Sequence, residues 1–271
     1  GLGLIGGSLA KALKENTEHT VIGFDRDENT LLDALSLGAI DSVGSTSLLE
    51  NADVVYVCLY PADVVRFVEE NAPHFKEGCI VTDVCGIKNQ VCGKLTEIAK
   101  NYPFVYVGGH PMAGTEFSGV EHAFAEMFRD SHFLLVPRDD SRPEHIALLE
   151  RLAAYIGCKD VCRTTAQAHD ALIAYTSQMM HSIAVAVCDD PSLFQYQGVC
   201  GDSFRGCTRV AALDVPLWTQ LFTMNAKALG SALEELEKNI RTYRQAIEAG
   251  DTTTLVEKLS YSAARKRKMN R

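Results

Sequence analysis

Residues 108–114 read GGHPMAG and set one titratable imidazole, His110, between two glycines and a proline. An imidazole changes its charge near neutral pH, so it can accept or release a proton during a reaction. The apolar run FVYV precedes the glycines and is typical of a buried strand. We therefore expect His110 at the carboxyl end of a strand, as a proton acceptor. The glycines would let the backbone approach a ligand closely, and Pro111 would hold the imidazole still.

The chain opens with a second chemical motif, Gly1-Leu2-Gly3-Leu4-Ile5-Gly6, which has GxGxxG spacing. Glycines at these positions bring backbone N–H groups and a helix N-terminus up to a pyrophosphate. The motif normally follows a strand, so we expect a strand before Gly1 that is missing from this sequence. The helical pattern SLAKALKEN and the strand-like HTVIGF come next, and the latter leads to Asp25.

Asp25 occupies the position at which dinucleotide-binding proteins hold the ribose. Its carboxylate can accept hydrogen bonds from both ribose hydroxyls of NAD and would repel the 2′-phosphate of NADP. The sequence therefore favours NAD as cofactor. Arg26 leaves the choice open, because a guanidinium beside this position can bind that phosphate.

Short apolar runs alternate with helical patterns as far as residue 164, which predicts an α/β Rossmann-type, doubly wound parallel sheet. From Thr164 onward only helical patterns remain. We therefore predict a dinucleotide-binding domain over 1–164 and an all-α helical domain over 165–271, for substrate binding and dimerisation. The apolar helices of the second domain exceed what one small helical domain can bury, which predicts a homodimer.

Ligands of such sheets bind outside the carboxyl ends of the strands. Two further strand ends are predicted to flank the cofactor, one after DVVYVCL and one after GCIVTDV. They supply Tyr60, Pro61, Cys85 and Gly86.

Composition excludes several classes of function. The net charge of −9 argues against nucleic acid or an anionic membrane as a partner. We find no apolar run of the roughly 18 residues that span a bilayer. The nine cysteines include no CxxC pair, so we expect buried, reduced thiols in a cytoplasmic protein and no metal site.

The block GGHPMAGTEFSGVEHA, with TDVCGIK before it and TRVAALDVPLW after it, resembles the prephenate dehydrogenase family. The resemblance extends over essentially the whole chain. It implies NAD-dependent oxidative decarboxylation of prephenate to 4-hydroxyphenylpyruvate in tyrosine biosynthesis. His110 matches the family's catalytic histidine, and Thr115 and Glu116 match positions at the mouth of its active site.

The resemblance also assigns substrate-binding roles in the helical half, to His181 and Arg209. A lone histidine on an apolar helix is by itself more often a core residue. An arginine amid Cys, Val and Ala would be costly to bury without an anion, and its planar fork suits a carboxylate. Trp218 matches a segment of the family pattern, but core packing explains this residue equally well. We interpret His169-Asp170 as a helix cap or as support for other site residues.

Two features depart from the family pattern. Many relatives carry Gly-Ser where this chain has Cys85-Gly86, so the serine that helps orient the catalytic histidine is missing. Residues 178–181, QMMH, keep only the last histidine of the His-Leu-Pro-His stretch that relatives often have. After the last helix we expect neither an ACT-type regulatory domain nor a chorismate mutase segment.

Alternative functions stay open at this point. Arogenate dehydrogenase uses the same scaffold on the amino-acid analogue of prephenate, and a non-catalytic NAD-sensing protein is a further alternative. A 3-hydroxy-acid dehydrogenase would carry a catalytic lysine on the long interdomain helix, and residues 169–190 contain no lysine. The choice between prephenate and arogenate, the strictness for NAD and inhibition by tyrosine are left undecided.

Overall fold

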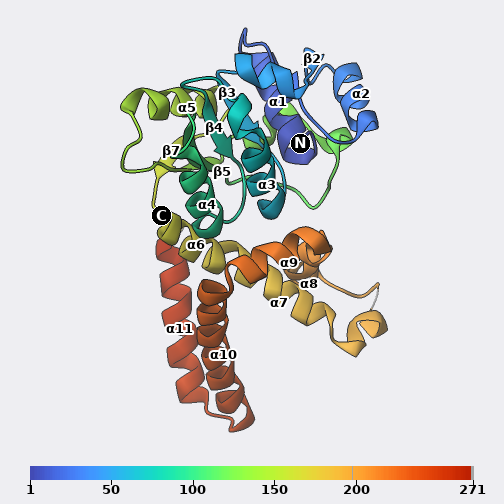
Figure 1. The fold of residues 1–271 in the computed structure, drawn as a ribbon. Helices are drawn as coiled ribbons and strands as arrows, with labels where there is room; N and C mark the ends of the chain where they lie inside the picture. The colour runs from blue at the N-terminus through green and yellow to red at the C-terminus, as the bar shows by residue number, and fades with distance from the viewer. Residues whose placement is uncertain (197, 270–271) are drawn as a thin grey trace. The chain divides into compact units, whose positions relative to one another are not determined.

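The computed structural model describes residues 1–196 and 198–269 (Figure 1). Residue 197 and the last two residues of the predicted second domain lie outside the described part. Helices and strands alternate through the first part of the chain, as the sequence predicts. The strands are β1 Ile22–Gly23, β2 Ser42–Val43, β3 Val54–Val57, β4 Ile80–Asp83, β5 Val105–Pro111, β6 His132–Val136 and β7 Asp160–Arg163. The helices between them are α1 Leu4–Asn16, α2 Glu28–Ser36, α3 Pro61–Asn71, α4 Asn89–Ala99 and α5 Pro143–Tyr155.

Five strands form one sheet in the order β3-β4-β5-β6-β7, and β1 pairs with β2 separately. All the pairings between these strands are parallel except that of β5 with β6, which is antiparallel and sets His110 opposite Leu134. The predicted parallel sheet is thus confirmed for its core, and only the pairing of β5 with β6 departs from it. The reversal follows from the connection, because residues 112–131 contain only short 3-10 turns and no crossover helix.

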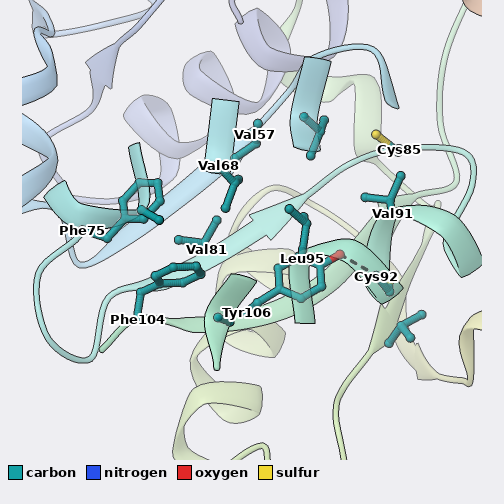
Figure 2. Close-up of a cluster of buried hydrophobic side chains, with 14 of the residues drawn as sticks. Val57, Val68, Phe75, Val81, Cys85, Val91, Cys92, Leu95, Phe104 and Tyr106 are labelled. Carbon is teal, nitrogen blue, oxygen red and sulfur yellow. Dashed lines mark hydrogen bonds between the residues drawn. The ribbon is translucent and has the colours of Figure 1, made fainter. Parts of the chain in front are cut away.

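Both faces of the sheet are covered, as in a doubly wound fold. Val81 of β4 and Tyr106 of β5 pack with α3 and α4 in one apolar cluster (Figure 2). Their neighbours Ile80 and Val107 point to the other face and pack with α1 and α5. Because successive strand residues alternate in direction, burial on both faces explains the continuous apolar runs in the sequence.

The described residues after Thr164 contain helices and turns but no strand, as the sequence predicts. α6 Ala166–Ile173 passes through a π turn, Ala174–Gln178, into α7 Met179–Cys188. α8 Asp202–Thr208, α9 Val215–Met224, α10 Ala226–Glu248 and α11 Thr252–Met269 follow. By compactness the chain separates into Gly1–Asn225 and Ala226–Arg271, so α6 to α9 belong with the sheet in the first unit.

Among the described residues, one helix is long and apolar enough to cross a membrane by length and composition alone. It is the continuous helix over Ala166–Cys188. The expectation that no segment reaches this limit was therefore wrong. The core helix of a soluble protein passes the same test. Of the apolar window of this helix, 28% is buried, and His169, Asp170 and Gln178 are buried on the helix and hydrogen-bond to neighbouring residues.

Candidate active site

The glycine-rich segment forms the turn into α1. A Cβ on Gly6 would lie 1.9 Å from the carbonyl oxygen of Gly1, and one on Gly1 would lie 2.3 Å from that of Cys58. These two glycines are thus required by close backbone packing. A Cβ on Gly3, the N-cap of α1, would meet nothing within 4 Å, and the first turn of α1 carries no acidic residue. This open helix N-terminus fits an anionic pyrophosphate.

Asp25 follows β1 and binds the glycine-rich turn directly. Its Oδ2 accepts a hydrogen bond from the backbone N–H of Leu2 at 2.7 Å, and its Oδ1 accepts one from Asp27 N–H at 3.0 Å. The carboxylate is therefore fixed beside the turn, with lone pairs left for further donors. Arg26 is exposed.

Tyr60 and Pro61 begin α3, where Tyr60 is the N-cap and Pro61 is the first helical residue. Pro61 is buried, and the Tyr60 hydroxyl donates to Asp214 Oδ2 at 2.5 Å. Burial and this contact raise the pKa of Tyr60 to about 12. Cys85 is buried beyond the end of β4, with its thiol 3.6 Å from the carbonyl oxygen of Leu59.

His110 is the next-to-last residue of β5, so it lies at the carboxyl end of that strand. Its side chain makes a close polar contact. Its Nδ1 is 2.8 Å from Nε2 of His169, on α6. The Nδ1 of His169 is in turn 2.8 Å from Oδ1 of Asp170. The other edge of the His110 ring faces Gly86, since a Cβ on that glycine would lie 3.9 Å from Nε2.

These contacts fix the tautomers of both imidazoles. The Asp170 carboxylate only accepts hydrogen bonds, so His169 donates from Nδ1 and, when neutral, accepts at Nε2. His110 must then donate from Nδ1, which leaves the lone pair on its Nε2. Burial, and after it unfavourable electrostatic interactions with His169 and Lys88, lower the pKa of His110 well below its usual value of 6.5. His110 is thus a neutral acceptor whose Nε2 faces Gly86.

Asp170 is held by backbone and side-chain groups from three segments. The backbone N–H groups of Lys88 and Asn89 donate to its two carboxylate oxygens at 2.7 and 2.8 Å. Its carbonyl oxygen accepts from Asn225 Nδ2 at 2.9 Å, and that amide also donates to Gln178 Oε1 at 2.7 Å. The carboxylate keeps a fixed position because each of its oxygens is bonded.

The loop between β4 and α4 is secured by a buried ion pair. Lys88 and Asp83 are both fully buried, and the ammonium of Lys88 contacts Oδ1 of Asp83 and donates to the carbonyl oxygen of Cys85 at 2.9 Å. Tyr106 donates to Asp83 Oδ2 at 2.7 Å. Burial opposes the charge on Lys88, but the attraction of Asp83 and the nearby thiols outweighs it and raises the pKa of Lys88. This pair fixes the loop that carries Gly86.

The glycines before His110 have a different role from the expected one. A Cβ on Gly108 would lie 2.7 Å from Sγ of Cys92, and one on Gly109 would lie 2.7 Å from the carbonyl oxygen of Asp83. The side chains are absent because α4 and β4 pack closely against β5, not because a ligand approaches there. The sequence suggested that Pro111 holds the imidazole still. In the structure, a hydrogen bond with His169 orients it.

His181 lies on α7 and stacks on Trp218 of α9, with ring centroids 3.7 Å apart. Its Nδ1 is 3.0 Å from the carbonyl oxygen of Ser177, so Nδ1 donates and the neutral ring keeps an acceptor at Nε2. Burial, which outweighs the Ser177 contact, and the positive charge of Arg209 lower the pKa of His181. Trp218 is thus a packing partner of a predicted site residue.

Arg209 does not lie buried as its apolar neighbours had suggested, since 58% of its side chain is exposed. Its Nη1 donates to Oε2 of Glu116 at 3.1 Å. The structure therefore brings together two predicted residues, and a carboxylate already lies at the guanidinium. Thr115 is in the same loop, where its hydroxyl accepts from Phe117 N–H at 3.3 Å.

Helix α9 contacts both groups of site residues. Trp218 packs on His181, while Leu221, one turn later, would contact a Cβ on Gly86 at 3.6 Å. Leu221 also accepts a hydrogen bond from Gln178 through its carbonyl oxygen at 3.0 Å. One short helix thus links the His110 side of the site with the His181 side.

Sequence reasoning missed the direct contact of His169 with His110. Thr165, not His169 or Asp170, caps α6, because its hydroxyl accepts from Ala168 N–H at 3.1 Å. The available signal was a His-Asp pair in a largely apolar helical segment, where polar residues need partners.

Comparisons with known proteins agree with this arrangement. Residues 9–162 match the family described as prephenate dehydrogenase, nucleotide-binding domain, and residues 165–261 match prephenate dehydrogenase, dimerization domain. The fold and the site define a dehydrogenase with a nucleotide-binding α/β domain followed by a helical dimerisation domain. The chain belongs to the prephenate dehydrogenase family.

Several relatives are similar over nearly the whole chain. The cyclohexadienyl dehydrogenase of Zymomonas mobilis is 30% identical, over 95% of this chain and 90% of the relative. The prephenate dehydrogenase of Bacillus subtilis is 26% identical, over 94% of this chain and 71% of the relative. A crystal structure of the A. aeolicus prephenate dehydrogenase in complex with hydroxyphenyl propionate and NAD+ has a TM-score of 0.86 and 27% identity, over 99% and 96% of the two chains. The crystal structure of Synechocystis arogenate dehydrogenase has a TM-score of 0.83 and 27% identity, over 99% of this chain and 98% of that chain.

Proposed function

We propose that this chain catalyses the NAD-dependent oxidative decarboxylation of prephenate to 4-hydroxyphenylpyruvate, in tyrosine biosynthesis. The observation that carries the proposal is the hydrogen-bonded row His110–His169–Asp170, which leaves Nε2 of His110 as a free acceptor. The A. aeolicus relative, crystallised with hydroxyphenyl propionate and NAD+, supports a ring-bearing acid and a dinucleotide as ligands.

The residues proposed to hold NAD are the glycines of the first turn, Asp25 and the strand-end positions. The open space over Gly3 at the N-terminus of α1 fits the pyrophosphate, and Asp25 fits the ribose. NAD, when bound, supplies the hydride acceptor. The full set is Gly1, Gly3, Gly6, Asp25, Arg26, Tyr60, Pro61, Cys85 and Gly86.

His110 provides the base in the proposed reaction. Prephenate carries a hydroxyl on ring C4 and a carboxylate on the opposite ring carbon. As the C4 hydrogen leaves as hydride, Nε2 of His110 accepts the hydroxyl proton. His169 and the Asp170 carboxylate then stabilise the imidazolium through Nδ1. Loss of the ring carboxylate as CO₂ makes the ring aromatic, and the proton returns to the phenolate oxygen.

Arg209 is proposed to anchor a substrate carboxylate, with His181, Thr115 and Glu116 completing the substrate site. In the structure, the Glu116 carboxylate lies at the Arg209 guanidinium and stands in for such a group. Substrate binding would exchange one carboxylate for another at the same planar fork. Glu116 would therefore limit entry to the site rather than react.

Arogenate is the second candidate substrate. The Synechocystis relative is an arogenate dehydrogenase, and the Zymomonas mobilis relative is a cyclohexadienyl dehydrogenase. His181 has its acceptor at Nε2, which could receive a hydrogen bond from the side-chain ammonium that arogenate has and prephenate lacks. The two substrates share the ring chemistry assigned to His110.

The proposed enzyme is a cytoplasmic homodimer that acts on a small molecule and has neither nucleic acid nor membrane as a partner. The net charge of −9 supports the first exclusion. The family's dimerization domain supports the dimer. We propose that the boundary between the nucleotide-binding and helical domains lies near residue 164, and the two matched ranges support this proposal.

The test mixes the protein with prephenate or arogenate and with either NAD or NADP. The absorbance of the reduced cofactor, NADH or NADPH, is then measured. We expect turnover with NAD and prephenate. In Arg209→Ala, the KM for the substrate should rise by roughly 10- to 150-fold, the equivalent of a lost charged hydrogen bond. Binding of NAD without turnover of either substrate would leave the non-catalytic NAD-sensing function and would overturn the proposal.

A further inference from the structure

Three metal-ligating side chains meet on strands β6 and β7, outside the proposed active site. His132, Asp160 and Cys162 are exposed, and their donor atoms all lie within 4.8 Å of one another. Nδ1 of His132 contacts Oδ1 of Asp160, and Sγ of Cys162 lies 4.0 Å from the same oxygen. One carboxylate oxygen is thus shared by an imidazole and a thiol.

The strand register holds these donors together. His132 is paired with Asp160 across the two parallel strands, and Leu134 is paired with Cys162. Residues two apart on a strand project to the same face, so the three donors share one face. The intervening residues Phe133 and Val161 pack on the opposite face with α5. The cluster therefore rests on paired backbone, although its side chains are exposed.

We propose that His132, Asp160 and Cys162 form a binding site for a zinc-type divalent cation. Imidazole nitrogen, carboxylate oxygen and thiolate sulfur are the ligands that zinc accepts in proteins. Tetrahedral zinc separates such donors by roughly 3.3–3.6 Å, given metal–ligand bonds of about 2.0–2.3 Å. The donor atoms lie up to 4.8 Å apart, and rotations of the exposed side chains that move these atoms by about an ångström would bring them to that separation. Water would supply the fourth ligand.

The charges in the cluster also suit a cation. Asp160 contributes one negative charge, and Cys162 contributes a second when binding releases its thiol proton to solvent. No electron transfer is involved. The bound ion would join β6 to β7, the last strand in the sheet order. It would stabilise that edge without taking part in the reaction assigned to His110.

The experiment is a titration of the reduced full-length protein with Co²⁺, which gives a strong near-ultraviolet band when bound to thiolate. We expect the band to saturate at one ion per chain. Cys162→Ser should abolish it, and the matched control Cys207→Ser, which removes the other exposed cysteine, should leave it unchanged. A band that persists in Cys162→Ser, or no band in the unsubstituted chain, would overturn the proposal.

A second measurement separates a built site from a single reactive thiol. Competition of Zn²⁺ against Co²⁺ gives the affinity of each variant. Losing a partner outside the coordination sphere costs about 10–100-fold in metal affinity, so losing a direct ligand should cost at least as much. His132→Gln and Asp160→Asn should each weaken binding to this extent. Unchanged affinity in both variants would show adventitious binding to Cys162 and would also overturn the proposal.

Discussion

At the scale of single residues, three side chains from two elements set the protonation of the proposed base. His110 comes from β5, and His169 and Asp170 come from α6. Asp170 imposes the tautomer of His169, which in turn imposes that of His110. Each imidazole donates toward Asp170, because the carboxylate at the end of the row cannot donate a hydrogen bond. Its outcome is a lone pair on Nε2 of His110.

The lowered pKa values of His110 and His169 predict how stability and activity depend on pH. Burial is the largest cause for both, and it disfavours the charged imidazole. The unfolded chain therefore binds more protons than the folded one below the usual histidine pKa of about 6.5. Stability from these groups is fully present above that value and decreases as the pH falls toward the folded-state pKa values.

We expect kcat/KM to be constant with respect to His110 above about pH 6.5 and its acidic decline to lie below that value. Profiles between about pH 5 and 8, with denaturant unfolding at both ends, provide the measurement. His110→Asn should show a smaller loss of stability on acidification. An acidic decline centred above the ordinary histidine pKa would contradict the assigned environment.

Two glycines near the base make a matched pair for substitution. A Cβ on Gly86 meets no atom closer than 3.6 Å, so Gly86→Ser should fold normally and place a hydroxyl next to Nε2 of His110. Gly109→Ser would put a Cβ 2.7 Å from the backbone oxygen of Asp83 and should lose about 1–3 kcal/mol of stability through overpacking. Thermal unfolding compares the variants. Equal destabilisation would mean that the packing around Gly86 is misassigned.

At the scale of elements, the turn into α1 contains two kinds of glycine. Gly1 and Gly6 are required by close backbone packing, whereas a Cβ on Gly3 would face open space. Gly3→Ala should leave the unfolding temperature nearly unchanged, because its Cβ meets nothing within 4 Å. It should weaken NAD binding, since the methyl group occupies the space proposed for the pyrophosphate. Calorimetric titration with NAD measures the affinity.

Gly6→Ala serves as the control for that substitution. Its Cβ would lie 1.9 Å from the carbonyl oxygen of Gly1, so the turn must distort and the protein should be destabilised. If Gly3→Ala bound NAD as tightly as the unsubstituted chain, the pyrophosphate would have to lie elsewhere.

Local patterns predicted the elements better than their pairing. One of the helical patterns expected before residue 164 is NQVCGKLTEIA, which forms α4 in the structure, because one face of that helix is buried against the sheet. The antiparallel pairing of β6 was not predictable, since residues 132–136 have the same apolar pattern in either direction. The contact of His169 with His110 spans 59 residues, and no local signal encodes it. The cluster on β6 and β7 was missed for the same reason.

At the scale of the whole molecule, the second compact unit exposes apolar side chains that a monomer would leave in water. It consists of α10 and α11, which form a helical hairpin (Figure 1). Ile240 and Ile247 of α10 are 56% and 65% exposed, and Val256 and Leu259 of α11 are 65% and 59% exposed. Such exposure on two adjacent helices is typical of an interface between chains.

Light scattering at micromolar concentration should give the mass of two chains. Ile240 and Ile247 are two turns apart and share one face of α10, so a double substitution to Glu should yield monomers. Lys238→Ala, which removes a solvated ion pair with Glu234, should leave the dimer intact. Monomers of the unsubstituted chain would contradict the proposed assembly.

The central claim is that Nε2 of His110 is the base for the C4 hydroxyl of the substrate. Turnover of His110→Asn with saturating NAD and prephenate tests it most directly, with NAD affinity measured on the same sample. We predict a fall in kcat of about 10²- to 10⁴-fold, the usual contribution of a general base, and an unchanged NAD affinity. Turnover within about tenfold of the unsubstituted enzyme, or a loss confined to NAD binding, would contradict the account.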